Sequence, residues 1–307
     1  MPSQALVKRT GLIAILVALG SGSTALAKSA KAPSACSLLA GARSDQLVHA
    51  PFRVIDGRIY LEARANGRGP FIFALDTGAS GMGRIDAALA AALGLPPAGS
   101  GESSDGVSRA TVDLVKVRSV VLERLERRDM EMISRDYRSR LRPEAAFAGI
   151  LGREFFADGL LTIDYPNRIV TFVRSRHLLP TMHGALSYDK AFRVPVTIGS
   201  VKSTGNLDTG ANAAFVLPKD LYDQVSGEPL GNATEAGLTN STIATHRTVL
   251  KGPFEVGLAR ATDVEVRVAT AFPELLVGAH FLKDYALLID QRSRAVALCP
   301  SGKQPRR

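Results

Sequence analysis

The chain has 307 residues, of which 46% are hydrophobic and 22% are charged, and these values exclude a largely disordered chain and a fibrous repeat. The 38 Lys and Arg residues outnumber the 29 Asp and Glu residues, a surplus that would suit nucleic acid or an acidic surface. The two cysteines are too few for a cysteine-ligated zinc site or a disulfide-dense scaffold. Because 28 glycines and 16 prolines indicate many turns, we expect a soluble globular protein rich in β structure.

The first 27 residues have the pattern of an export signal. Lys8 and Arg9 give a positive start, residues 11–19 form a short apolar run, and residues 25–27 (Ala-Leu-Ala) form a small-x-small cleavage site. The apolar run is short for a membrane span, and no later stretch reaches that length. We therefore expect cleavage near Ala27 and a periplasmic or secreted mature chain with no transmembrane span. The alternative is an uncleaved N-terminal anchor.

Two cysteines lie near the two ends of the mature chain, at Cys36 and Cys299. In an oxidising compartment, a pair placed in this way is able to form a disulfide that ties the termini together. The alternative is two unpaired thiols. Given the export signal, we expect the disulfide.

An internal repeat organises the rest of the sequence. Residues 150–172 align without a gap on residues 276–298, with an offset of 126 (278 − 152). Each copy predicts a short helix followed by two strands joined by a tight turn. The identical pairs include Gly152/Gly278, Phe155/Phe281, Asp158/Asp284, Leu161/Leu287, Ile163/Ile289, Asp164/Asp290, Arg168/Arg294 and Val170/Val296.

The repeat continues upstream of these segments. The apolar residues 71–75 lead into Asp-Thr-Gly-Ala at 76–79, and residues 206–207 lead into the same tetrapeptide at 208–211, with an offset of 132 (208 − 76). A helix is expected over residues 85–95 in the first copy and a shorter one over 218–225 in the second. We therefore divide the chain into a signal peptide (1–27), an N-terminal segment (28–50), a first lobe (51–175), a linker (176–191), a second lobe (192–300) and a basic tail (301–307).

The residues of the repeated tetrapeptide suit acid–base chemistry. A carboxylate at the end of an apolar strand is held on a rigid support, and the glycine two residues later lets the backbone N–H approach it. If the two lobes pack about a pseudo-twofold axis, Asp76 and Asp208 face each other. Two carboxylates so close share one proton, so one acts as a base and the other as an acid. Such a pair is able to activate a water against an amide carbonyl.

These motifs resemble the aspartic proteases, the clan of retropepsin-like and pepsin-like enzymes. The resemblance rests on residues 74–80 with Ile-Leu-Gly at 150–152, and on residues 207–212 with Leu-Val-Gly at 276–278. It is most similar to bacterial exported aspartyl proteases with two retropepsin-like repeats in one chain. The resemblance implies a mostly β, bilobal acid protease fold, in which short helices accompany two β lobes related by a pseudo-twofold axis.

The resemblance also implies roles for six residues and an aspartic endopeptidase activity on polypeptides. Asp76 and Asp208 would be the catalytic dyad, and Thr77 and Thr209 would form mutual hydrogen bonds that lock the two loops together. Gly78 and Gly210 would present N–H groups to the carboxylates. No metal or other cofactor is implied, and a monomer is expected.

The sequence departs from the pepsin-like pattern in two ways. Many pepsin-like members have Ser or Thr after Asp-Thr-Gly, whereas Ala79 and Ala211 stand here, and fewer hydrogen bonds to the carboxylates should give a milder pH optimum. The expected hairpin over residues 99–117, which would cover the site, has no tyrosine. The second lobe has a possible counterpart over residues 231–243.

Other interpretations of the sequence compete with this one. A catalytically silent peptide-binding module would keep the same cleft. In a further alternative, each lobe pairs with a lobe of a second chain, as in retroviral proteases. The Arg-rich residues 118–142 contain interleaved acids, which indicates a solvated, ion-paired surface; with the export signal, no nucleic-acid partner is expected. The five histidines show no metal-binding spacing.

Overall fold

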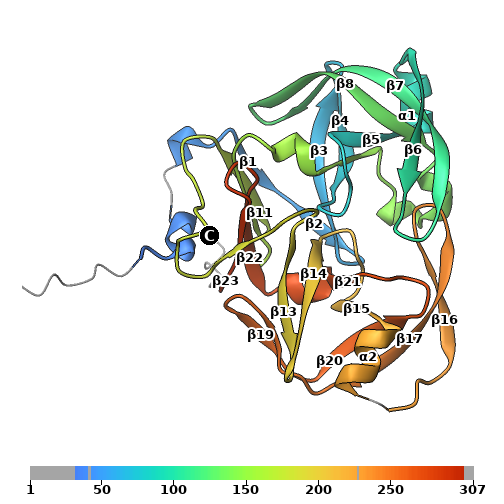
Figure 1. Ribbon diagram of the computed structural model, residues 1–307. Helices are drawn as coiled ribbons and strands as arrows, with labels where there is room; N and C mark the ends of the chain where they lie inside the picture. The colour runs from blue at the N-terminus through green and yellow to red at the C-terminus, as the bar shows by residue number, and fades with distance from the viewer. Residues whose placement is uncertain (1–31, 41–42, 227, 301–307) are drawn as a thin grey trace, which may run out of the picture. The chain divides into compact units, whose positions relative to one another are not determined.

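The computed structural model describes residues 32–40, 43–226 and 228–300. The predicted signal peptide and basic tail lie outside these residues. The described chain is mostly β with short helices, as the sequence predicted (Figure 1). In this part of the chain, no helix has the length and apolar character needed to cross a membrane.

The first lobe is built on an eight-stranded sheet with the order β2-β3-β4-β9-β5-β8-β7-β6. Helix α1 (Ala87–Ala92) follows β5, and the Asp86 carboxylate caps it by accepting a hydrogen bond from Ala88 N–H. Two 3₁₀ turns, Arg138–Arg140 and Pro143–Ala145, connect β8 to β9. The strands are β2 (Arg53–Ile55), β3 (Arg58–Ala65), β4 (Arg68–Leu75), β5 (Gly83–Asp86), β6 (Pro97–Ser104), β7 (Arg109–Leu122), β8 (Leu125–Arg135) and β9 (Gly149–Leu151).

The second lobe is built on a nine-stranded sheet with the order β16-β17-β20-β15-β21-β14-β13-β18-β19. Helix α2 (Lys219–Val225) begins directly after Pro218. The helices predicted in the two lobes are therefore confirmed, and α1 is shorter than expected because Leu93 and Gly94 end it. The strands are β13 (Arg193–Ile198), β14 (Val201–Asp208), β15 (Phe215–Pro218), β16 (Ala233–Gly237), β17 (Thr242–Leu250), β18 (Phe254–Val256), β19 (Ala259–Ala261), β20 (Val264–Ala269) and β21 (Leu275–Gly278).

A six-stranded sheet with the order β1-β11-β10-β22-β23-β12 joins the two repeats. Its centre is the antiparallel pair β10–β22, in which Ile163 lies opposite Leu287. A 3₁₀ turn (Arg153–Phe156) precedes the first hairpin and α3 (Ala279–Leu282) the second, so the predicted helix and two strands are confirmed in both copies. The strands are β1 (Val48–Pro51), β10 (Leu160–Asp164), β11 (Ile169–Val173), β12 (Ala185–Ser187), β22 (Tyr285–Asp290) and β23 (Ala295–Pro300).

One hydrophobic core extends through all three sheets. Phe73 of β4, Phe215 of β15 and Ile163 of β10 are each fully buried in it. Burial of apolar area at about 25 cal/mol per Å² makes such a shared core the main force that holds the sheets together. The limits of the lobes at residues 175 and 192 stay a prediction.

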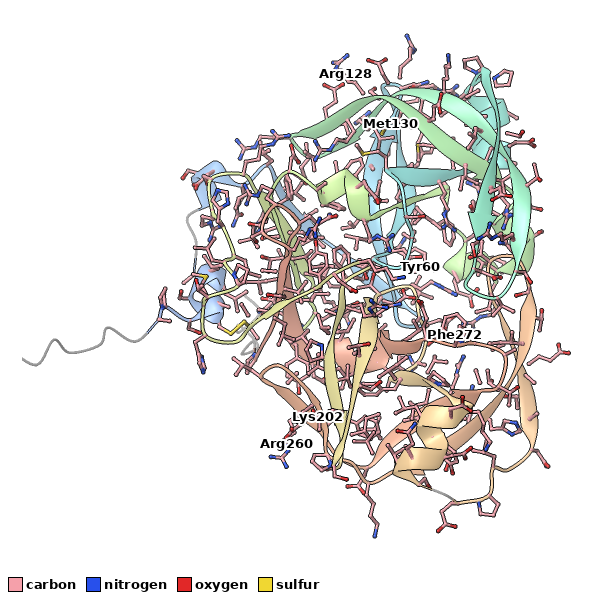
Figure 2. All side chains as sticks on the ribbon, in the orientation of Figure 1. Tyr60, Arg128, Met130, Lys202, Arg260 and Phe272 are labelled. Atoms are coloured by element: carbon pink, nitrogen blue, oxygen red, sulfur yellow. A yellow bond between two sulfur atoms is a disulfide. The ribbon has the colours of Figure 1, made fainter. Side chains whose placement is uncertain are left out.

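The expected disulfide joins Cys36 to Cys299. Cys36 lies in the 3₁₀ turn Ala35–Leu39, which a second turn, Arg43–Asp45, follows, and Cys299 is a buried residue of β23. Figure 2 draws the bond in yellow. The bond is compatible with an oxidising compartment, and it ties the start of the described chain to its last strand.

The Arg-rich residues 118–142 form parts of β7 and β8 and the turn after them. Arg127 pairs with Asp158, and Arg128, labelled in Figure 2, pairs with Glu126 at 2.8 Å. Arg142 pairs with Asp56 at 2.6 Å. The predicted ion-paired surface is confirmed, and screening by water makes each exposed pair worth little on its own.

Candidate active site

The two aspartates end equivalent strands of the two lobes. Asp76 directly follows β4, and Asp208 is the last residue of β14. Each of these strands pairs in parallel with the hydrophobic-hydrophobic-Gly element of its own lobe, so that Leu75 lies opposite Leu151 and Asp208 opposite Gly278. The repeat noticed in the sequence therefore places both carboxylates at the buried ends of equivalent strands.

The threonines after the aspartates interlock across the two lobes. Thr77 N–H donates to Thr209 Oγ1 at 3.0 Å, and Thr209 N–H donates to Thr77 Oγ1 at 2.9 Å. The Thr77 hydroxyl donates to the Leu207 carbonyl at 2.9 Å, and the Thr209 hydroxyl donates to the Leu75 carbonyl at 3.1 Å. Both threonines are buried, so all four bonds lie away from water. This arrangement holds the two aspartate loops in one fixed relation.

The glycines bring the two carboxylates together. Gly78 N–H donates to Asp76 Oδ1 at 2.8 Å, and Gly210 N–H donates to Asp208 Oδ1 at 2.8 Å. A Cβ atom on Gly78 would lie 2.6 Å from Asp208 Cγ, and one on Gly210 would lie 2.6 Å from Asp76 Cγ. Each carboxylate thus rests against the glycine of the opposite loop, a contact that any side chain at these positions would prevent.

Burial and the contact with Asp76 change the pKa of Asp208. Burial raises the pKa of Asp208, and the negative charge of Asp76 and a hydrogen bond to it raise this pKa further. Backbone N–H groups of Gly210 and Ala211 oppose this rise by stabilising the charged form. The physical consequence is that Asp208 keeps its proton to a higher pH than an ordinary aspartate does.

A cleft of about 1200 Å³ opens above the pair. Both lobes line it, with Ile150 on the side of the first lobe and Leu276 on the side of the second. The lining also includes charged side chains of both signs, among them Arg84 and Glu274. A cavity of this size with apolar walls and a few polar groups is typical of a ligand-binding site.

Two hairpins, one from each lobe, meet over this cleft. They are β6–β7 and β16–β17, and they correspond to the hairpins predicted over residues 99–117 and 231–243 (Figure 1). Asn240 N–H donates to Asp105 Oδ2 at 2.7 Å, and the Ser241 hydroxyl donates to the same oxygen at 2.9 Å. The Asn240 side chain also donates to the Ser103 carbonyl at 2.7 Å. We call this set of bonds the hairpin latch.

Comparison with known families agrees with this geometry. Residues 61–155 match the family model described as Aspartyl protease. The matched residues are less than half of the chain, and they support its resemblance to the aspartyl proteases. The matched residues run from β3 to the 3₁₀ turn after β9, and they include Asp76 and the Ile-Leu-Gly element. No curated protein matches the chain.

The match agrees with the resemblance seen in the sequence, and the fold is mostly β and bilobal, as that resemblance implied. It supports a general aspartic protease function, while the roles of the individual residues stay predictions. In the described ranges, no group of three or more His, Cys, Asp or Glu side chains is placed to hold a metal ion.

The sequence analysis missed several polar groups around the aspartates. Arg153 Nη1 lies 3.4 Å from the Gly78 carbonyl, and its guanidinium lies 5.9 Å from the Phe192 ring. Tyr165 is buried and its hydroxyl has no hydrogen-bond partner among the described residues. Burial, and then the charges of Asp208 and Asp76, raise the pKa of this hydroxyl. Neither Arg153 nor Tyr165 belongs to a recognisable motif. The only signal in the sequence is the repeat offset of 126, which aligns Arg153 of the first lobe with Ala279 of the second and so shows a charge in one lobe only.

Proposed function

We propose that the protein is an aspartic endopeptidase that hydrolyses peptide bonds with a water held between Asp76 and Asp208. The observation that carries this proposal is the contact between the two carboxylates, each of which lies against the glycine of the opposite loop. In this geometry one proton serves two acids, so a base and an acid stand side by side at the same pH.

The proposed reaction uses both members of the pair. The ionised carboxylate takes a proton from the water as its oxygen attacks the amide carbonyl carbon. The protonated carboxyl group donates its proton to the carbonyl oxygen, and a proton then passes to the leaving nitrogen as the C–N bond breaks. Thr77 and Thr209 act as positioning residues, because their buried hydrogen bonds hold the two loops in register.

The cleft suits a polypeptide in an extended conformation. Its walls come from both lobes, and the hairpins that cover it carry backbone and side-chain groups on their inner faces. Because the hairpin latch closes the cleft, the hairpins must separate to admit a chain. We place the mature enzyme outside the cytoplasm, on the basis of the predicted export signal, and we take it to act as a monomer.

The test is cleavage of an unfolded protein by purified residues 28–307, with Asp76→Asn and Asp208→Asn variants beside the parent. We expect each variant to lose about a hundredfold to ten-thousandfold in kcat/KM. Asp113→Asn is the matched control, because Asp113 is exposed on β7 and lies outside the cleft. Loss of activity in one aspartate variant only would contradict a shared site. An inactive but folded parent would indicate a peptide-binding module instead.

The pH dependence adds a second readout. Activity requires one ionised and one protonated carboxyl group, so it should fall as pH rises through the raised pKa of Asp208 and the pair loses its proton. Since the folded state binds this proton more tightly than the unfolded state, the stability that the proton provides is also lost over that range. Asp208→Asn should therefore become more stable relative to the parent as pH rises towards neutrality. A constant difference in stability would contradict the shared proton.

A further inference from the structure

A buried arginine lies in the wall of the cleft on the side of the first lobe. Arg84 belongs to β5, where it lies opposite Ile150 of β9, and it is only 7% exposed. Its side chain lines the cleft. The repeat offset of 132 aligns Arg84 with Val216, which lines the cleft from the second lobe. At this pair of equivalent positions, therefore, the first lobe carries a charge and the second lobe does not.

Arg84 has no partner of opposite charge in the part of the chain that the structure describes. Its Nε atom is buried and makes no hydrogen bond. The acid two residues along the same strand, Asp86, is engaged elsewhere: it accepts hydrogen bonds from Ala88 N–H and Tyr137 N–H and pairs with Arg138. Because an unpaired buried charge is costly, a ligand that brings an anionic group would compensate for it.

The surroundings of Arg84 favour a ligand with several hydrogen-bond acceptors. The Tyr137 ring packs on Phe147 at 5.6 Å between centroids, and its buried hydroxyl has no hydrogen-bond partner among the described residues. Burial raises the pKa of this hydroxyl, which keeps its proton, while the nearby guanidinium groups of Arg84 and Arg135 act in the opposite sense. Arg135 is already engaged with the Thr239 carbonyl at 2.8 Å. Arg84 Nε and the Tyr137 hydroxyl thus lack hydrogen-bond partners beside the apolar residues Phe147 and Ile150 of the cleft wall.

We propose that Arg84 is a specificity-determining residue that binds the carboxylate of an acidic side chain of the polypeptide substrate. This inference rests on the proposed function, which makes the ligand of the cleft a polypeptide. The planar guanidinium fork matches a carboxylate, and the Tyr137 hydroxyl supplies a further donor. The residue recognised lies close to the bond that is cut, because Arg84 lines the same cleft as Asp76 and Asp208 and lies opposite Ile150 on the strand beside β4.

The experiment measures binding, so that it does not depend on catalysis. The probes are peptides with capped ends and one reduced, non-hydrolysable central bond, in which a single Glu occupies each position in turn. A matched set carries Gln in place of Glu. Dissociation constants are measured at about pH 6.5, where the Glu side chain is ionised. We compare the parent with Arg84→Val, which gives the first lobe the residue of the second, and with Arg84→Lys. Arg118→Val is the control, because Arg118 is exposed on β7 and lies outside the cleft.

We expect the parent to bind the Glu peptide about tenfold to a hundredfold more tightly than the Gln peptide at one position. Arg84→Val should abolish this preference, Arg84→Lys should keep part of it, and Arg118→Val should keep it whole. Equal binding of the two sets by the parent, no binding of either, or a preference that survives in a folded Arg84→Val variant, would overturn the inference. A preference that depends on Arg84 without any cleavage of ordinary peptides would refute the proposed hydrolysis and leave this inference standing.

Discussion

The interlock of Thr77 and Thr209 gives a prediction whose magnitude follows from the structure. Thr77→Val keeps the shape of the side chain and removes its hydroxyl. The hydroxyl accepts a hydrogen bond from Thr209 N–H and donates one to the Leu207 carbonyl. Both partners are left buried, since Thr209 and Leu207 are each 0% exposed. Each buried group that loses its partner costs about 1–3 kcal/mol, so we expect a loss of about 3 kcal/mol in the free energy of unfolding.

Urea unfolding at equilibrium measures this loss, and two variants serve as controls. Thr77→Ser keeps the hydroxyl and should cost about 1 kcal/mol for the lost methyl group. Thr245→Val removes one hydrogen bond, to the Thr234 carbonyl at 3.2 Å, from a residue that is equally buried in the β16–β17 hairpin. It should also cost about 1 kcal/mol. If Thr77→Val and Thr245→Val lose the same free energy, the interlock is no stronger than an ordinary side-chain bond and the reasoning fails.

Two further predictions concern the ends of the chain and the roof of the cleft. Replacing both Cys36 and Cys299 by Ala opens a loop of 263 residues. Chain entropy gives an upper value of about 5–6 kcal/mol for the loss in the free energy of unfolding, and we expect thermal or urea unfolding to measure about 3–4 kcal/mol. An unchanged free energy of unfolding would contradict this prediction. Asn240→Ala removes the side-chain bonds that Asn240 donates to the Ser103 and Ser108 carbonyls and accepts from Arg135, while the Ser241 bond to Asp105 remains. Amide hydrogen exchange in the β16–β17 hairpin should therefore quicken about tenfold or more, whereas the exposed Asn232→Ala should change nothing. Equal rates in the two variants would show that the Asn240 side chain does not hold the hairpins together.

The sequence predicts the parts of this fold that depend on local patterns. The paired tetrapeptides at 76–79 and 208–211, and the aligned segments 150–172 and 276–298, predicted two similar lobes and the contact between their aspartates. The reason is physical: a carboxylate packed against a backbone requires glycine at one position, and a buried parallel strand requires an apolar run. Such requirements fix residue types at fixed spacings, and those are visible in a sequence.

The hairpin latch and Arg84 were not predictable in this way. Asp105 and Asn240 are 135 residues apart, and each stands in a polar turn of ordinary composition. Arg84 is one of many arginines in a basic chain. It lacks a partner because the fold places no free carboxylate within reach of its guanidinium group in the described residues. Contacts of this kind depend on how the lobes face each other, and a local pattern carries no information about that.

The two lobes show why it matters that both belong to one chain. In a site formed by two identical chains, every residue of the cleft occurs twice, so a side chain that suits one end of a bound peptide is also present at the other end. Here the equivalent positions hold Arg84 and Val216, and the equivalent strand residues Ala74 and Asn206 also differ. A peptide has a direction, and its two ends present different side chains. Duplication within one chain therefore lets the cleft distinguish the two ends of a peptide while Asp76 and Asp208 keep the symmetry that the shared proton requires.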